Sequence, residues 1–254
     1  MSRMAQAVIM LLFGGAIIKA TITDVFLRYV KEGLRPFLLV AGILLVAAAL
    51  MTIWYDLRAG RQAPSESSSP DGPEPSADPH DEHDDGHGHG HHEPRVGRLL
   101  LLPVLGLLLI SPPALGSFAA GQAGSVGLSA ASDYPPLPDG DPIEVSLLDY
   151  ASRAVFDSGR SLTGRNVKLT GFITPGPDGK PMIARMVLTC CAADGRPIKI
   201  GMAGVPIDAP ADAWVEVVGV YSSQIGTDPV NQARVAYVDV RSWQEIDEPK
   251  QPYA

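Results

Sequence analysis

Hydrophobic residues are concentrated near the start of the chain, in two uninterrupted stretches. Residues 37–55 are nineteen residues without a charge and end in Trp54 and Tyr55. This length crosses a bilayer as a helix, and aromatic side chains favour its interface. Residues 5–22 are also apolar, and their one cation, Lys19, lies near the end, where its side chain can reach water. Residues 1–57 therefore predict two transmembrane helices joined by a short basic loop.

A signal peptide is the alternative for the first stretch, because Arg3 precedes an apolar run. However, no small-residue cleavage site follows it, and the second stretch begins almost at once. We therefore expect a retained membrane helix. Gly14-Gly15 and the small-xxx-small pair of Ala16 and Ala20 would allow a close helix contact there, although such residues are also ordinary in a lipid-facing helix.

A third apolar stretch, residues 99–118, contains Pro103, Pro112 and Pro113. Because proline removes helix hydrogen bonds, the regular helix is expected to stop near Ser111. We predict a third transmembrane helix within residues 96–118. No Lys or Arg follows it until Arg153, which is typical of an exported segment. The C-terminal region is therefore expected outside the cell, and the loop between the second and third helices in the cytoplasm.

That loop, residues 58–95, is rich in Pro, Ser and Asp and is expected to be a disordered linker. Between Asp71 and Glu93 it carries eight acidic residues and no Lys or Arg. It also contains every histidine of the chain: His80, His83, His87, His89, His91 and His92. Flexible imidazoles beside carboxylates can bind zinc, nickel or copper weakly. A simple soluble spacer, or a pH response through histidine titration, are the alternatives.

After residue 118 the pattern changes from long apolar runs to short periodic segments. Residues 119–141 are rich in turn residues and predict an extended tether. Residues 146–159 predict a short amphipathic helix that Ser146 caps. Its buried side is expected to carry Leu147, Tyr150, Ala154 and Val155.

Five strand-like segments complete the chain, and their apolar residues alternate or run continuously between glycine-rich turns: 166–175, 182–191, 196–204, 214–223 and 233–246. Five short strands of this kind favour a small barrel that resembles the oligonucleotide/oligosaccharide-binding (OB) fold, over residues 142–254. The expected fold class is therefore an α+β membrane protein, with three N-terminal transmembrane helices and a five-stranded OB-like β-barrel domain. Residues 118–254 carry sixteen acids and eleven bases, so we expect no nucleic-acid partner.

The only two cysteines, Cys190 and Cys191, are adjacent, and Asp194 follows three residues later. On a regular strand the two thiols would point to opposite faces. If the strand is broken there, adjacent thiols can bind a soft cation, and Asp194 can complete or orient the site. The alternatives are one packed and one exposed cysteine beside a plain hairpin turn, or a disulfide with a partner. Because this domain has no histidine and no phosphate-binding glycine loop, we expect no enzymatic activity.

Four segments carry a family resemblance: TGFI (170–173), CCAADGRP (190–197), WVEVVGV (214–220) and EPKQPY (248–253). With the early apolar spans, they resemble the bacterial family of two-component membrane permease complex subunits. The resemblance implies N-terminal spans, a small β-rich domain and a separate multi-span permease as partner. The family's hallmark positions fall here on Cys190, Cys191, Ala193, Asp194, Pro197, Trp214, Pro252 and Tyr253.

We therefore expect a non-catalytic accessory subunit of a permease complex in the cell membrane, linked to metal-ion handling. Its partners would be the multi-span permease and membrane lipid. The alternative is a stand-alone, membrane-tethered thiol or metal-binding module, or an envelope sensor.

Overall fold

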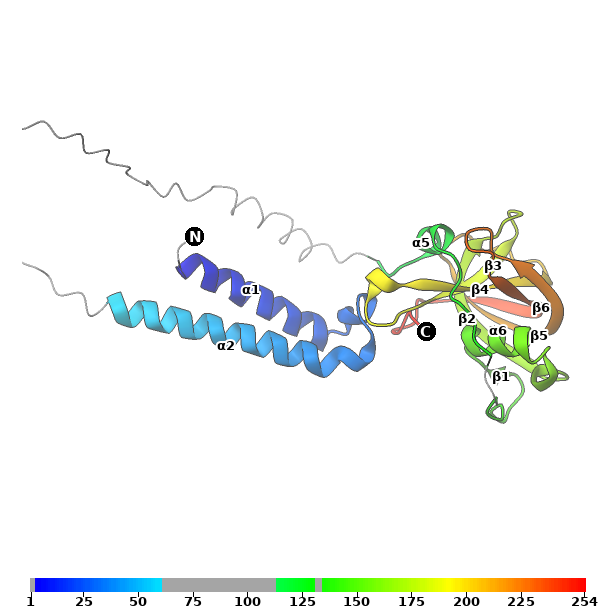
Figure 1. Ribbon diagram of the computed structural model, residues 1–254, viewed down its shortest axis with the longest axis horizontal. Coiled ribbons are helices and arrows are strands. Elements are labelled where there is room, and N and C mark those ends of the chain that lie inside the picture. The colour runs from blue at the N-terminus through cyan, green and yellow to red at the C-terminus, as the bar shows by residue number, and fades with distance from the viewer. Residues whose placement is uncertain (1–2, 61–112, 131–133) are drawn as a thin grey trace, which may run out of the picture. The chain divides into compact units, whose positions relative to one another are not determined.

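The computed structural model describes residues 3–60, 113–130 and 134–254 (Figure 1). The contacts divide them into two compact units. The helical unit contains residues 3–18 and 39–60, and the β unit contains residues 19–38 and 113–254. Most of the predicted linker and of the predicted third transmembrane helix lies outside the described residues, and residues 58–60, predicted as the start of the linker, are helical instead.

Two long apolar helices dominate the N-terminal part, α1 (Arg3–Ile22) and α2 (Arg35–Gly60). Both are long and apolar enough to cross a membrane, and little of either is buried by the rest of the chain. They contain the two stretches that the sequence predicts as transmembrane helices. At the end of the predicted third helix, residues 113–116 are not helical, and Ser117 begins the short helix α5 (Ser117–Gln122).

Small residues bring α1 and α2 together in the helical unit. Ala7 and Gly14 of α1, and Gly42 and Ala49 of α2, are buried and lie seven residues apart on each helix. A Cβ atom added at Gly14 would lie 2.9 Å from the carbonyl oxygen of Gly42. The two backbones therefore approach as closely as small-residue membrane interfaces allow.

Only part of the small-residue pattern seen in the sequence makes this contact. Gly14 lies in the crossing, whereas a Cβ at Gly15 would meet nothing within 4 Å. Ala16 and Ala20 are half-buried. The residues that form the contact follow a seven-residue spacing instead of the four-residue one.

The C-terminal domain is a closed five-stranded β-barrel. The sheet has the order β1-β2-β3-β4-β6-β5 and closes through β2 and β5. The β4–β6 and β1–β2 pairs are parallel and the others antiparallel. The strand bounds are β1 Ile143–Glu144, β2 Asn166–Pro175, β3 Pro181–Val187, β4 Arg196–Gly204, β5 Trp214–Thr227 and β6 Arg234–Ile246. The five barrel strands fall where the hydrophobic pattern predicts them.

Strand alternation fills the barrel. Val167, Leu169 and Ile173 of β2 are buried in one core cluster with Val238 and Val240 of β6. Their alternate neighbours point outward, as the period of a strand requires. The prediction of a barrel with an apolar interior is therefore confirmed.

Helix α6 (Leu147–Phe156) packs against this core. The Ser146 side chain accepts a hydrogen bond from the Asp149 N–H, so it is the predicted cap. The four residues predicted for its inner side, Leu147, Tyr150, Ala154 and Val155, are all buried. Short 3₁₀ helices occur at Val25–Arg28, Glu32–Leu34, Arg160–Leu162 and Ala192–Asp194.

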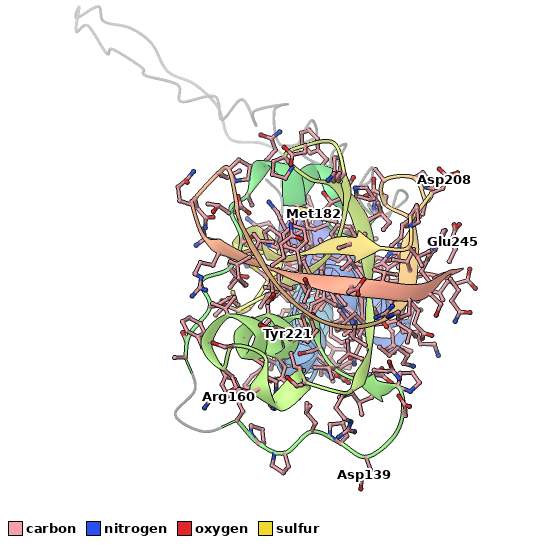
Figure 2. The ribbon with its side chains drawn as sticks, turned by 90° about the vertical axis from the view of Figure 1, so that its right-hand side faces the viewer. Asp139, Arg160, Met182, Asp208, Tyr221 and Glu245 are labelled. Atoms are coloured by element: carbon pink, nitrogen blue, oxygen red, sulfur yellow. The ribbon has the colours of Figure 1, made fainter. Side chains whose placement is uncertain are left out.

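A second, smaller apolar cluster lies outside the barrel, where α5 covers β2 and β3. It contains Ala120 of α5 with Phe172, Ala184 and Met186 of the strands. In the segment predicted as an extended tether, residues 119–122 belong to α5 instead, and the other described residues form no helix or strand. This segment is fastened to the barrel, since the Val126 N–H donates to the carbonyl of Pro197 at 2.8 Å. Elsewhere the barrel presents polar side chains to solvent, among them the labelled Asp139, Asp208 and Glu245 (Figure 2).

Candidate metal centre

The two cysteines lie in a tight turn between β3 and β4. Strand β3 ends at Val187, and the 3₁₀ helix at Ala192–Asp194 follows the cysteines. The Asp194 carboxylate closes the turn, because it accepts hydrogen bonds from the backbone N–H groups of Thr189 at 3.0 Å and Cys190 at 2.8 Å. The predicted strand to residue 191 is therefore four residues too long, and the thiols do not alternate across a sheet.

The turn gathers three ligand atoms. The sulfur atoms of Cys190 and Cys191 and one carboxylate oxygen of Asp194 all lie within 4.8 Å of one another. Two zinc–sulfur bonds of about 2.3 Å can span at most about 4.6 Å, so small side-chain adjustments would let one cation contact both thiolates. Within the described residues, no other group of His, Cys, Asp and Glu side chains has this spacing.

The turn is open to solvent. Cys190 is exposed and Cys191 is half-buried, and both are free thiols. Three protein ligands leave at least one coordination position vacant, which is typical of sites that exchange a ligand and unlike closed structural zinc sites. Two thiolates also favour copper(I) or zinc over magnesium or calcium.

Without a cation the Cys190 thiol stays protonated near neutral pH. Its hydrogen bond to the Asp194 carboxylate, together with the neighbouring Cys191, raises the pKa of Cys190 to about 11. The hydrogen bond from the Cys190 backbone N–H is the main cause that lowers the pKa of Asp194. Cation binding at this turn would therefore have to release the thiol proton.

The turn pairs with the loop that connects α1 and α2. The Lys31 N–H donates to the Cys190 carbonyl at 3.1 Å, and the Ala192 N–H donates to the Tyr29 carbonyl at 2.7 Å. Val30 and Cys191 form an antiparallel β-bridge between these two bonds. The backbone that carries both thiols is thus hydrogen-bonded to the interhelical loop.

The end of the chain strengthens this attachment. The Tyr253 hydroxyl donates to the Arg28 carbonyl at 2.7 Å and accepts from the Leu115 N–H at 3.1 Å. The Gln251 side-chain amide donates to the Glu32 carboxylate at 2.6 Å. We call these contacts, with the pairing of residues 29–31 and 190–192, the loop clasp.

Sequence reasoning named Cys190, Cys191 and Asp194 as candidate cation ligands, and the structure brings them together, but it missed the loop clasp. The resemblance marked Tyr253 as a hallmark without giving it a role, and nothing local in residues 29–31 indicates pairing with a turn 160 residues later. The predicted histidine ligands, His80 to His92, lie outside the described residues. The structure therefore brings together Cys190, Cys191 and Asp194.

The comparison with protein families concerns the same domain. Residues 145–254 match the DUF1980 C-terminal domain. The match includes α6, the five barrel strands, the cysteine turn and Tyr253. It covers less than half of the chain, and the DUF1980 domain carries no assigned function. No curated protein and no solved structure matches the chain.

Proposed function

We propose that this protein is a membrane-anchored, non-catalytic module that binds a soft metal cation at the Cys190-Cys191-Asp194 turn, and that it serves a membrane permease as an accessory subunit. The convergence of two thiols and one carboxylate in one exposed turn supports this function best. Thiolates are soft ligands and prefer soft cations. An open coordination position would allow the bound cation to be passed to another ligand.

The loop clasp supports the anchoring role. The cation ligands belong to the same backbone that pairs with the loop between α1 and α2. A cation bound there would lie beside residues 29–31, which belong to the segment that connects α1 to α2. This is the position that a subunit needs if it presents a cation at a membrane surface.

The clasp also supports the three-helix topology. If α1 and α2 cross a membrane, their connecting loop and the barrel lie on one side, because the clasp joins them. Helix α2 then ends at Gly60 on the other side, and the chain has to return before Pro113. We infer that the third crossing lies within residues 96–118, as the sequence predicts. Its regular helix is expected to stop near Ser111 and is short for a full crossing, which local thinning of the bilayer would accommodate.

We infer that the barrel is of the OB type. If the barrel strands β2 to β6 are numbered 1 to 5, their order around the barrel is 1-2-3-5-4. The barrel closes between strands 1 and 4, and strands 3 and 5 are parallel. This arrangement supports the OB-like prediction, although barrel type alone assigns no ligand.

A titration of purified protein with zinc or copper(I) tests the metal function. We would use the reduced chain in detergent with residues 78–94 deleted, so that the histidines do not contribute. One cation per chain is expected, and Cys190→Ser with Cys191→Ser should abolish that binding. Asp194→Asn should weaken it, whereas Asp208→Asn, at an exposed acid of the β4–β5 loop, should not. Equal binding by the double cysteine variant would refute the metal function.

Purification from native membranes tests the accessory role separately. The tagged full chain should remain in a complex of fixed stoichiometry with one multi-span membrane protein after a wash at high salt. A detergent-solubilised chain that is always alone, but still binds one cation, would favour the stand-alone module.

A further inference from the structure

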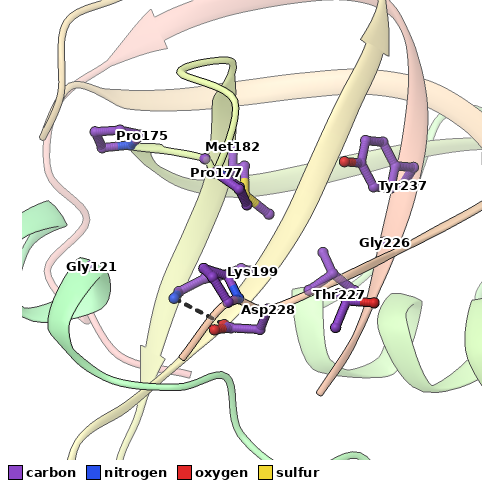
Figure 3. Close-up of a pocket in the computed structure, with 12 residues that line it drawn as sticks. Gly121, Pro175, Pro177, Met182, Lys199, Gly226, Thr227, Asp228 and Tyr237 are labelled. Carbon is purple, nitrogen blue, oxygen red and sulfur yellow. Dashed lines mark hydrogen bonds and ion pairs between the residues drawn. The ribbon is translucent and has the colours of Figure 1, made fainter. Parts of the chain in front are cut away.

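A second site lies on the outer face of the barrel, away from the cysteine turn. A pocket of about 230 Å³ opens there, lined by Met182 of β3, Lys199 of β4 and Tyr237 of β6 (Figure 3). Residues 175–177, at the β2–β3 connection, and residues 226–229, at the β5–β6 connection, border it on two sides. None of the residues of the cysteine turn or the loop clasp lines this pocket.

One of the polar groups that line this pocket is a buried lysine. Lys199 is 8% exposed, and its Nζ atom donates to Asp228 Oδ2 at 3.0 Å and to the Ala123 carbonyl at 3.0 Å. An ammonium group has three N–H donors. These two hydrogen bonds use two of the three donors, and we infer that the third can donate to a molecule in the pocket.

The Asp228 carboxylate, which pairs with Lys199, accepts further hydrogen bonds on both of its oxygens. Oδ2 of Asp228 also accepts hydrogen bonds from the N–H and hydroxyl of Ser125, and Oδ1 accepts from the Val230 N–H. The ion pair is neutral as a whole. A charged ligand would therefore add a net charge beside a neutral ion pair that is itself buried, which is unfavourable, whereas a neutral oxygen acceptor would not.

A flat aromatic wall completes the pocket. The Tyr237 ring lies over two strand positions that are glycine, Gly201 and Gly226, and a Cβ atom added at Gly201 would overlap the ring. These glycines let the ring lie against the sheet. Aromatic surfaces of this kind favour stacking with another flat ring.

We propose that this pocket binds a compact, neutral molecule with a flat apolar body and a carbonyl oxygen, which accepts the free N–H of Lys199 while its body contacts Tyr237 and Met182. The volume equals that of about seven or eight water molecules at about 30 Å³ each, which suits a single ring with a small substituent. In OB-type barrels the corresponding face and loops bind ligands, so the position agrees with the inferred barrel type.

Three aromatic probes test the proposal: benzamide (neutral, with a carbonyl), benzoate (the anion of the same size and shape) and toluene (a smaller ring without an acceptor). The readout is the methyl NMR signal of Met182 in the full chain in detergent, assigned with Met182→Leu. Benzamide should shift this signal saturably, on the order of millimolar, as expected for a molecule of about nine heavy atoms. Benzoate and toluene should each bind at least about fivefold more weakly.

Two variants change the pocket and leave the buried ion pair intact, so a loss of binding does not have to reflect a loss of folding. Thr227→Phe should fill the pocket without touching the ion pair, and Tyr237→Leu should remove the flat wall; each should weaken benzamide at least about tenfold. Phe118→Leu, at an exposed ring of α5 outside the pocket, should leave the affinity unchanged. The proposal fails if no probe shifts Met182, if benzoate binds more tightly than benzamide, or if Thr227→Phe and Tyr237→Leu bind benzamide normally.

Discussion

The barrel carries two polar clusters of opposite construction. At the cysteine turn, Cys190 is exposed and two thiols lie beside a carboxylate that accepts hydrogen bonds from backbone N–H groups of the turn and from the Cys190 thiol. At the ion pair, the side chain of Asp228 is 0% exposed, and one of its oxygens accepts from Ser125 and Lys199 together. One cluster has unused ligand atoms in solvent, and the other has nearly every polar atom paired in the interior.

This difference separates the parts that hold the fold from the part that can exchange a ligand. Buried polar groups stabilise a structure only while all their partners are present, so losing one partner is costly. Exposed groups contribute little to stability, but they can change partners without rearranging the core. We therefore expect substitutions at the two clusters to have opposite effects on stability and on cation binding.

The largest effect is expected for Lys199→Met, which leaves the buried Asp228 carboxylate without its cation. Removing one partner of a buried ion pair typically costs about 3–5 kcal/mol of unfolding free energy. Urea denaturation of the full chain in detergent would measure it. Lys180→Met, at an exposed lysine of the β2–β3 loop, should stay within about 0.5 kcal/mol. Equal stability of the two variants would contradict the structural role of the pair.

Acidification should produce the next largest effect. Burial alone would raise the pKa of Asp228, but hydrogen bonds from Ser125 and Val230 and the Lys199 ammonium lower it to about 2. An unfolded aspartate titrates near about 3.9. Because the folded pKa is the lower one, this contribution is present above about pH 4 and is lost as the pH falls to about 2, by about 2 kcal/mol.

Urea denaturation at successive pH values between 4 and 2 would measure this loss. The unfolding free energy of Asp228→Asn should depend less steeply on pH in this range, because the variant lacks this carboxyl. This holds whatever the stability of the variant at neutral pH. An unchanged slope in Asp228→Asn would show that other acids cause the acid sensitivity.

A smaller loss is expected in the loop clasp. Tyr253→Phe removes one hydroxyl that donates to Arg28 and accepts from Leu115. The loss of these hydrogen bonds should cost about 1 kcal/mol. Hydrogen exchange at the amides of Lys31 and Ala192, which bond across the clasp, should become faster while exchange in the barrel strands does not change. Uniform acceleration across the barrel would show that Tyr253 supports the whole domain.

The smallest change in stability is expected where the change in function is largest. Cys190→Ser and Cys191→Ser keep the turn, because Asp194 closes it through backbone N–H groups. Their unfolding free energies should therefore differ from that of the parent chain by no more than about 0.5 kcal/mol. A thermal melt in detergent checks this. A loss above about 2 kcal/mol would mean that the thiols are part of the packing.

Sequence periodicity predicted the elements whose structure depends on near neighbours. The cap at Ser146, the buried side of α6 and all five barrel strands follow from local spacing, because one face of each element must be buried. The end of β3 was placed wrongly, since Leu188 continues the apolar pattern and is buried although it lies in the turn. The hydrophobic pattern does not indicate that the Asp194 carboxylate accepts hydrogen bonds from the backbone N–H groups of Thr189 and Cys190.

The missed features all depend on contacts between distant segments. Lys199 lies between Ile198 and Ile200 inside the strand RPIKIGMAG, and a charge between two apolar residues was the one available signal of a buried partner. The sequence around Ser125 and around Asp228 does not indicate that these residues bond to each other and to Lys199. The same holds for residues 29–31, whose pairing with the cysteine turn no pattern of one segment can show.

The central claim, that Cys190 and Cys191 bind a cation together, is tested most directly by X-ray absorption spectroscopy of the zinc-loaded chain that lacks residues 78–94. We predict two sulfur neighbours at about 2.3 Å, with oxygen or nitrogen ligands completing the shell. A shell without sulfur, or with one sulfur only, would contradict the claim.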